Sequence, residues 1–136
     1  MTKINNKKCY ITYCCKDKKT DSGLLAAIDR YLSDRIKYVY NLAKQDNAEF
    51  FILSGKFGLI SAYEKIEYYD KLLGLDEIQK ISEKIAEQLK LAEAQNVIFF
   101  HFDIKKDPNI QRYYDALKLA CQKAEINFIS KEIDIE

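Results

Sequence analysis

The segment Ser54-Gly55-Lys56-Phe57-Gly58 combines the features of an anion-binding loop. Two of the four glycines in the chain occur here, where they permit a close backbone approach or a positive φ. The lysine can hold an anion, and the serine hydroxyl can donate to it. We interpret all five residues as ligand-binding. The alternative is a turn in which the glycines serve backbone geometry alone.

The spacing of this loop excludes the common nucleotide-binding motifs. It does not match GxxxxGK[ST], and no GxGxxG occurs in the chain. An ordinary nucleoside-triphosphatase or dinucleotide site is therefore not indicated.

Carboxylates and phenols follow closely in the stretch from Glu64 to Asp70. A phenol can stack on a base, and a carboxylate beside aromatic rings can have its pKa moved toward acid/base work or can hold a ribose hydroxyl. We assign the catalytic roles to Tyr69 and Asp70, and read Glu64 and Lys65 as solvated surface. The alternative for Tyr69 is packing on the core.

A third group, Cys14-Cys15-Lys16, comes at the end of the first expected strand. Adjacent lysines lower the pKa of a thiol and so favour the thiolate. Separately, we expect Cys14, Lys16 and Lys18 to bind ligand. A thiol nucleophile paired with His101, the single histidine, is one reading of this group. The other is that strand cysteines are small buried hydrophobes and that the histidine is structural.

Basic residues are unevenly distributed although the whole chain has a net charge of only +1. Within the first 21 residues, Asp17 and Asp21 face a larger set of lysines: Lys3, Lys7, Lys8, Lys16, Lys18 and Lys19. This cluster could contact phosphates of a ligand or of a nucleic acid. Lysines that solvate a sheet edge and a loop are the alternative.

The composition indicates an ordered protein without a cofactor or metal motif. With 136 residues, one proline, 48% apolar and 32% charged side chains, the chain fits a single domain spanning residues 1–136. The four cysteines lack zinc-site spacing, so reduced thiols are expected. Without a signal peptide or a membrane-length apolar run, we expect a cytoplasmic protein with no membrane contact.

The elements that must position these residues alternate along the chain. Strands are expected at 9–15, 49–53, 96–102 and 125–129, because these stretches are apolar and β-forming. For the last strand, an extension to 135 is the alternative. Helices are expected at 21–44, capped by Asp21 or Ser22, at 76–94, and from an Asp107-Pro108 start to about 124.

This order predicts an α/β fold of three layers, α/β/α, around a mainly parallel sheet of about four strands. The candidate groups follow the first two strands. They should therefore meet at the carboxyl edge of the sheet, where open α/β folds bind ligands.

The three candidate segments, after the first strand, after the second strand and at Glu64 to Asp70, together resemble domain-of-unknown-function family 6884. The resemblance covers about the first half of the chain and rests on the cysteine turn with Lys16, the Leu53-to-Leu59 loop and the Tyr69-Asp70 pair. Gly55 and Phe57 stand where the family pattern has alanine and tyrosine. The family is distantly similar to YaaA proteins and to the domain accompanying archaeosine-type tRNA-modifying enzymes, which resemble the uracil-DNA glycosylase fold.

The resemblance implies handling of a nucleobase, nucleoside or nucleic acid. Our leading hypothesis is a protein that acts on a nucleotide, nucleoside or nucleobase, with N-glycosidic cleavage or transfer as the expected reaction. Whether the protein is an enzyme stays open. The alternative is a non-catalytic protein, in a phage or host-defence setting, that captures a nucleotide signal or a nucleic-acid segment. The ten tyrosines leave room for a homo-oligomeric contact.

Overall fold

The computed structural model describes residues 7–135, which form an α/β fold around a five-stranded sheet. The strand order is β4-β3-β1-β6-β7. The strands are β1 (Lys8–Tyr13), β3 (Glu49–Ser54), β4 (Gly58–Ile60), β6 (Asn96–His101) and β7 (Asn127–Glu132). All neighbours are parallel except β3 and β4, which form an antiparallel hairpin. The predicted α/β class and mainly parallel sheet are confirmed, and β4 is the additional strand.

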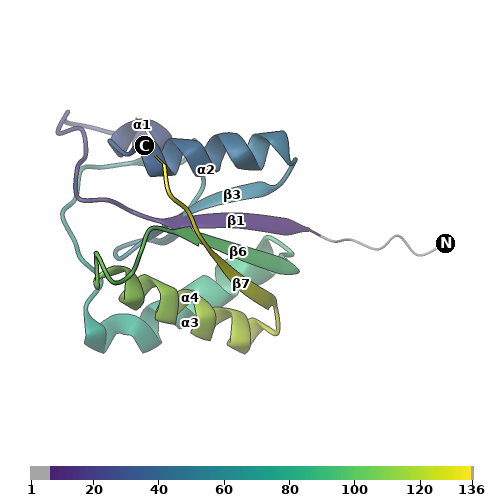
Figure 1. The fold of residues 1–136 in the computed structure, drawn as a ribbon. Helices are drawn as coiled ribbons and strands as arrows, with labels where there is room; N and C mark the ends of the chain where they lie inside the picture. The colour runs from purple at the N-terminus through teal and green to yellow at the C-terminus, as the bar shows by residue number, and fades with distance from the viewer. Residues whose placement is uncertain (1–6, 136) are drawn as a thin grey trace.

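Helices lie on both faces of this sheet (Figure 1). The connection from β1 to β3 carries α1 (Ala27–Arg30) and α2 (Asp34–Gln45) on one face. On the other face lie α3 (Ile78–Leu91), which precedes β6, and α4 (Ile110–Ala124), which precedes β7. The chain therefore moves from β1 to β3 in one direction, then returns across β1 to β6. The switch point of the topology lies between β1 and β6.

The single helix expected from 21 to 44 is wrong. Residues 25 and 26 form a short strand, β2 (Leu25–Ala26), which pairs with β5 (Lys65–Ile66), and α1 and α2 follow separately. Ser33 caps α2 because its side chain accepts the amide of Ile36. Asp21 and Ser22, the expected caps, lie in the preceding loop.

The buried Arg30 accounts for this break. Its guanidinium donates to four backbone carbonyls, those of Lys19, Asp21, Gly23 and Ile66, at 2.8–3.1 Å. A charged side chain with no exposed surface needs such partners. It ties the loop after β1 to β5 and stops a continuous helix.

The other helices begin later than expected. A 3₁₀ turn, η1 (Leu75–Glu77), precedes α3. Asp107 and Pro108 form the turn before α4, where the Asp107 carboxylate accepts the amide of Asn109 at 3.2 Å. Both differences are short shifts at helix ends, where side-chain caps and turns compete.

The central strand β1 is buried, as a strand covered on both faces must be. All four cysteines lie within residues 7–135 and are free thiols. Within the same residues, no helix is both long and apolar enough to cross a bilayer.

Candidate ligand-binding site

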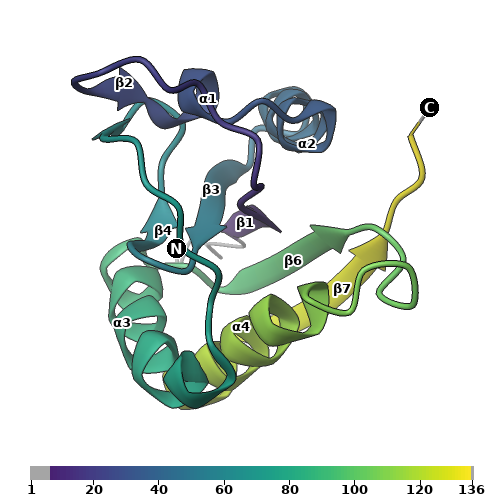
Figure 2. The same cartoon turned by 90° about the vertical axis from the view of Figure 1, so that its left-hand side faces the viewer.

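A cavity of about 850 Å³ opens at the carboxyl ends of β1 and β6, at the switch point of the sheet. Figure 2 views the molecule from the side toward which β1 and β6 run. Residues that follow β1, from Tyr13 to Lys18, form one part of the wall, and Phe102 follows β6. Two further parts come from the start of α2 and from residues 70–72. The residues around the start of α4 and Ile135 complete the lining, so segments distant in sequence converge here.

Four of the expected site residues line this cavity: Cys14, Lys16, Lys18 and Asp70. Lys18 is buried, whereas Lys16 and Asp70 are exposed. Asp70 makes no hydrogen bond or ion pair with another residue between 7 and 135, so its carboxylate is open to a ligand. The sequence prediction that the first strand end and Asp70 meet agrees with this geometry.

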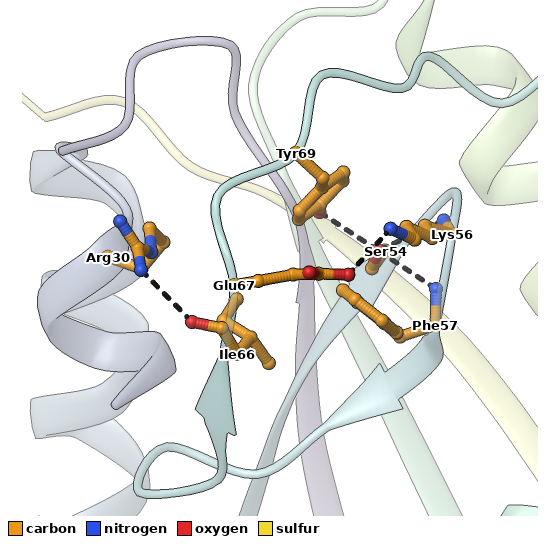
Figure 3. A network of polar contacts seen from close by, with 7 residues as sticks. All are labelled: Arg30, Ser54, Lys56, Phe57, Ile66, Glu67 and Tyr69. Carbon is orange, nitrogen blue, oxygen red and sulfur yellow. Dashed lines mark hydrogen bonds and ion pairs between the residues drawn. The ribbon is translucent and has the colours of Figure 1, made fainter. Parts of the chain in front are cut away.

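The remaining expected residues, Ser54 to Gly58 and Tyr69, do not line the cavity. Ser54 Oγ accepts the amides of Lys56 and Phe57, at 3.0 and 3.1 Å. The lysine Nζ lies 3.0 Å from a Glu67 carboxylate oxygen. Figure 3 shows these contacts gathered around the β3–β4 turn. Ser54 and Glu67 therefore already bind the lysine ammonium and two loop amides that were expected to hold an anion.

The two glycines of this loop permit close packing. A Cβ on Gly55 would lie 2.9 Å from the backbone nitrogen of Leu73. Gly58 has a φ of +74°, and a Cβ there would meet Gln88 Oε1 at 2.6 Å. That glutamine amide also binds the loop, accepting the amide of Leu59 and donating to its carbonyl. The glycines let the turn press against α3 and the segment before it.

Tyr69 is held in a buried chain of hydroxyl groups. Ser54 Oγ donates to the Tyr69 hydroxyl at 2.9 Å, and the same hydroxyl shares a short hydrogen bond with that of Tyr31. Burial raises the pKa of both phenols, so both stay protonated at neutral pH. Tyr69 therefore offers neither a phenolate base nor an exposed ring to a ligand in the cavity, contrary to its expected catalytic role.

Lys18 connects this chain to the cavity. Its Nζ lies 4.7 Å from the centroid of the Tyr69 ring and 5.7 Å from that of Tyr31, while the residue itself lines the cavity. Phe57 packs edge-on against the same Tyr69 ring, at 5.3 Å between centroids. The β3–β4 turn thus supports the cavity wall through Tyr69 and Lys18.

Tyr113 of α4 links two of the segments that form the cavity. Its hydroxyl accepts the Cys14 thiol at 3.6 Å and the amide of Leu73 at 3.2 Å. Arg112 donates to the carbonyl of Leu73 at 3.0 Å. These bonds hold the segment that carries Asp70, Lys71 and Leu72 to the cavity.

The structure does not bring a cysteine and His101 together as a nucleophilic pair. Cys15 Sγ donates to the carbonyl of Asp17, while the histidine stacks on Phe99 and its Nδ1 contacts the carbonyl of Phe102. Burial raises the pKa of the Cys15 thiol, which opposes thiolate formation.

The expected amino-terminal lysine cluster is divided between the two ends of β1. Lys7 precedes the strand, where it pairs with Glu49 at 3.4 Å, and Lys8 is the first strand residue. Lys16 and Lys18 follow the strand at the cavity end. Lys3 lies outside the described residues. A second hollow, of about 570 Å³, lies at the amino ends of β6 and β7, and none of the expected site residues borders it.

Sequence reasoning missed Arg35, a residue that lines the cavity. It donates to Thr12 Oγ1 and to the carbonyl of Tyr13, both at 2.6 Å, and lies 3.5 Å from the centroid of the Tyr13 ring. The sequence signal that could have found Arg35 is the capping pair Ser33-Asp34, which marks a helix start just before this arginine. Reading one helix from 21 to 44 concealed that start.

Comparison with known proteins gives a family match over most of the chain. Residues 10–130 match a family model described as a family of unknown function. No curated protein and no solved structure matches the chain. The match extends well beyond the segments that carried the resemblance, including α4 and most of β7. The chain belongs to the family of unknown function DUF6884.

Proposed function

We propose that the protein binds a nucleotide or nucleoside-like small molecule in the cavity between the ends of β1 and β6, with N-glycosidic cleavage or transfer as the chemistry. The observation that carries this proposal is the cavity's position at the switch point of a parallel sheet. Doubly wound sheets bind ligands, commonly nucleotides, in this crevice. The proposed relation to glycosylase-like folds rests on the sequence resemblance alone.

The size and lining of the cavity suit such a ligand. A volume of about 850 Å³ is within the usual range for a small-molecule site. Leu32 and Leu72 contribute half-exposed apolar side chains from two separate walls, and Phe102 adds a ring. These surfaces can contact a base, while the lysines and Asp70 provide polar contacts for a sugar or phosphate.

Asp70 is the residue we assign to the reaction. As a general base, its carboxylate would take a proton from water as the water oxygen forms a bond to the anomeric carbon. The bond from that carbon to the base nitrogen breaks, and the base leaves with the electron pair and takes up a proton. In a transfer reaction, an acceptor hydroxyl or amine would replace the water.

The alternative is capture of a nucleotide or a short nucleic-acid segment without conversion. One observation favours it: the Tyr69 hydroxyl is bound to Ser54 and Tyr31, so Asp70 is the only residue of the expected catalytic pair that reaches the cavity. A single carboxylate can orient a ribose hydroxyl as well as activate water.

The test incubates the protein with a panel of nucleotides, nucleosides and oligonucleotides and analyses released and retained molecules by mass spectrometry. The enzyme proposal expects a free base or an exchanged base as product. In the D70N variant, turnover should fall at least about a hundredfold while binding stays measurable, because a general base contributes that much.

Asp76→Asn is the matched control, because Asp76 is an exposed aspartate on the same connection that does not line the cavity. Unaltered, tightly held ligand would support capture instead of catalysis. The absence of binding by every panel member would overturn both forms of the proposal.

A further inference from the structure

We propose that Arg35 is the anion-binding residue of the cavity, so that the ligand is phosphorylated. Its phosphate would lie against the buried part of the lining that contains Arg35 and Lys18, here called the floor. This inference rests on the proposed function and narrows it from nucleotides, nucleosides and bases to nucleotides. Nothing in the sequence motifs or the family match assigns a role to this arginine.

Arg35 is a buried charge, at 4% exposed, without an ion-pair partner among the described residues. Its protein partners are a hydroxyl, the Tyr13 carbonyl, a longer contact to the Cys14 carbonyl and the Tyr13 ring. Burial lowers the pKa of this guanidinium, and neighbouring groups that include the Asp107 carboxylate partly oppose this shift. Arginine starts high enough to remain charged.

Arg35 also lies at the amino end of α2, in the first turn and two residues after the capping Ser33. A helix amino terminus carries partial positive charge, which disfavours a cation and favours an anion. A buried arginine at this place therefore costs stability in the empty protein, and an anion in the cavity would offset both charges.

The charged groups of the cavity also differ in burial. Of the four lining cations, Arg35 and Lys18 are buried, at 4% and 8% exposed, whereas Lys16 and Lys71 are exposed. The four lining carboxylates, those of Asp17, Asp34, Asp70 and Asp107, are on exposed residues. Water screens the exposed carboxylates more strongly than the buried cations, so the floor is positive even though the lining charges balance in number.

This separation also orients the ligand. A phosphate on the floor would direct the sugar and base of a nucleotide toward the exposed rim, which carries the four lining carboxylates. These carboxylates can accept hydrogen bonds from hydroxyl and amino groups. Asp70 lies on that rim, consistent with the role proposed for it at the sugar.

The first test needs no variant. Calorimetric titration of the intact protein with nucleoside monophosphates and the corresponding nucleosides should show about tenfold to hundredfold tighter binding of the phosphorylated form, the range for a charged hydrogen-bonded contact. Inorganic phosphate should compete. Equal affinity for both forms would overturn the role of Arg35 while leaving nucleoside binding intact. No binding by either form would instead overturn the proposed function.

Variants then assign the preference to one residue. R35M should abolish the discrimination between nucleotide and nucleoside, whereas R35K should keep part of it because it retains the charge. K37M is the control: Lys37 is an exposed cation on the same helix, and it does not line the cavity. Undiminished phosphate preference in a folded R35M would contradict the inference. If R35M fails to fold, the comparison of the two ligands on the intact protein decides.

Discussion

Two lysine-containing loops follow the neighbouring parallel strands β1 and β3, but only the loop after β1 lines the cavity. The loop after β3 contains serine, lysine and two glycines, and its polar groups bind one another or Glu67. The loop after β1 contains two cysteines and two lysines, and residues 14–18 all line the cavity. The serine-lysine-glycine loop, which looks more like an anion-binding motif, therefore supports the cavity wall and does not line the cavity.

The comparison teaches that composition alone does not identify a binding loop. A donor binds ligand only if the fold leaves it unused, and a hydroxyl two residues before an amide is a ready internal acceptor. Ser54 fills that role, and through Tyr69 it supports Lys18 at the cavity. The variants below test whether the β3–β4 turn acts on the ligand only indirectly.

The largest effect is expected for Gly55→Ala. The added Cβ would overlap the backbone of Leu73, so the substitution should lower the free energy of unfolding by about 3 kcal/mol, the upper part of the range for overpacking. It should also weaken ligand binding, because Leu73 belongs to the segment that carries Asp70. Urea denaturation and nucleotide titration measure the two effects.

Gly74→Ala is the control for that substitution, since the three atoms nearest to its Cβ are the side-chain ends of Asp76 and Glu77 instead of backbone. Moving them costs at most the hydrogen bonds of the Glu77 carboxylate. Equal costs for the two glycines would show that the turn does not depend on close packing against Leu73.

Ser54→Ala should have an intermediate effect, lowering the free energy of unfolding by about 2 kcal/mol. The amides of Lys56 and Phe57 would lose their acceptor and the Tyr69 hydroxyl a donor. Ser61→Ala, at an exposed serine, should change stability little. Ligand affinity should fall less than in R35M. If it fell as far with stability unchanged, Ser54 would contact the ligand directly.

The smallest effect on stability is expected for Lys56→Met. Its ion pair with Glu67 is exposed, with 42% and 62% of the two side chains accessible, and such pairs contribute less than about 1 kcal/mol. Nucleotide affinity should be unchanged. Lys16→Met, at the cavity, should instead reduce affinity and its salt dependence. The reverse result would restore the β3–β4 turn as the anion site.

Local patterns predicted the elements with strong periodicity. The apolar runs at 49–53 and 96–102 are the strands β3 and β6, and the stripe containing Ile81, Ile85 and Leu89 is the buried face of α3. The apolar stripe from 21 to 44 predicted one helix, which is wrong. Arg30 donates to the carbonyl of Ile66, and β2 pairs with β5, so contacts with a distant segment interrupt the helix. Such contacts leave no periodic signal.

The amino-acid sequence by itself determined the α/β class, the parallel sheet and the edge at which β1 and β3 end, because hydrophobic periodicity and chain order limit the topologies that can bury these strands. Only the tertiary structure decided which polar groups remain available. Ser54, Lys56 and Tyr69 are satisfied by neighbours, whereas Lys16, Asp70 and Arg35 line a cavity. Whether a donor is free depends on contacts between segments distant in sequence, which the order of residues alone does not display.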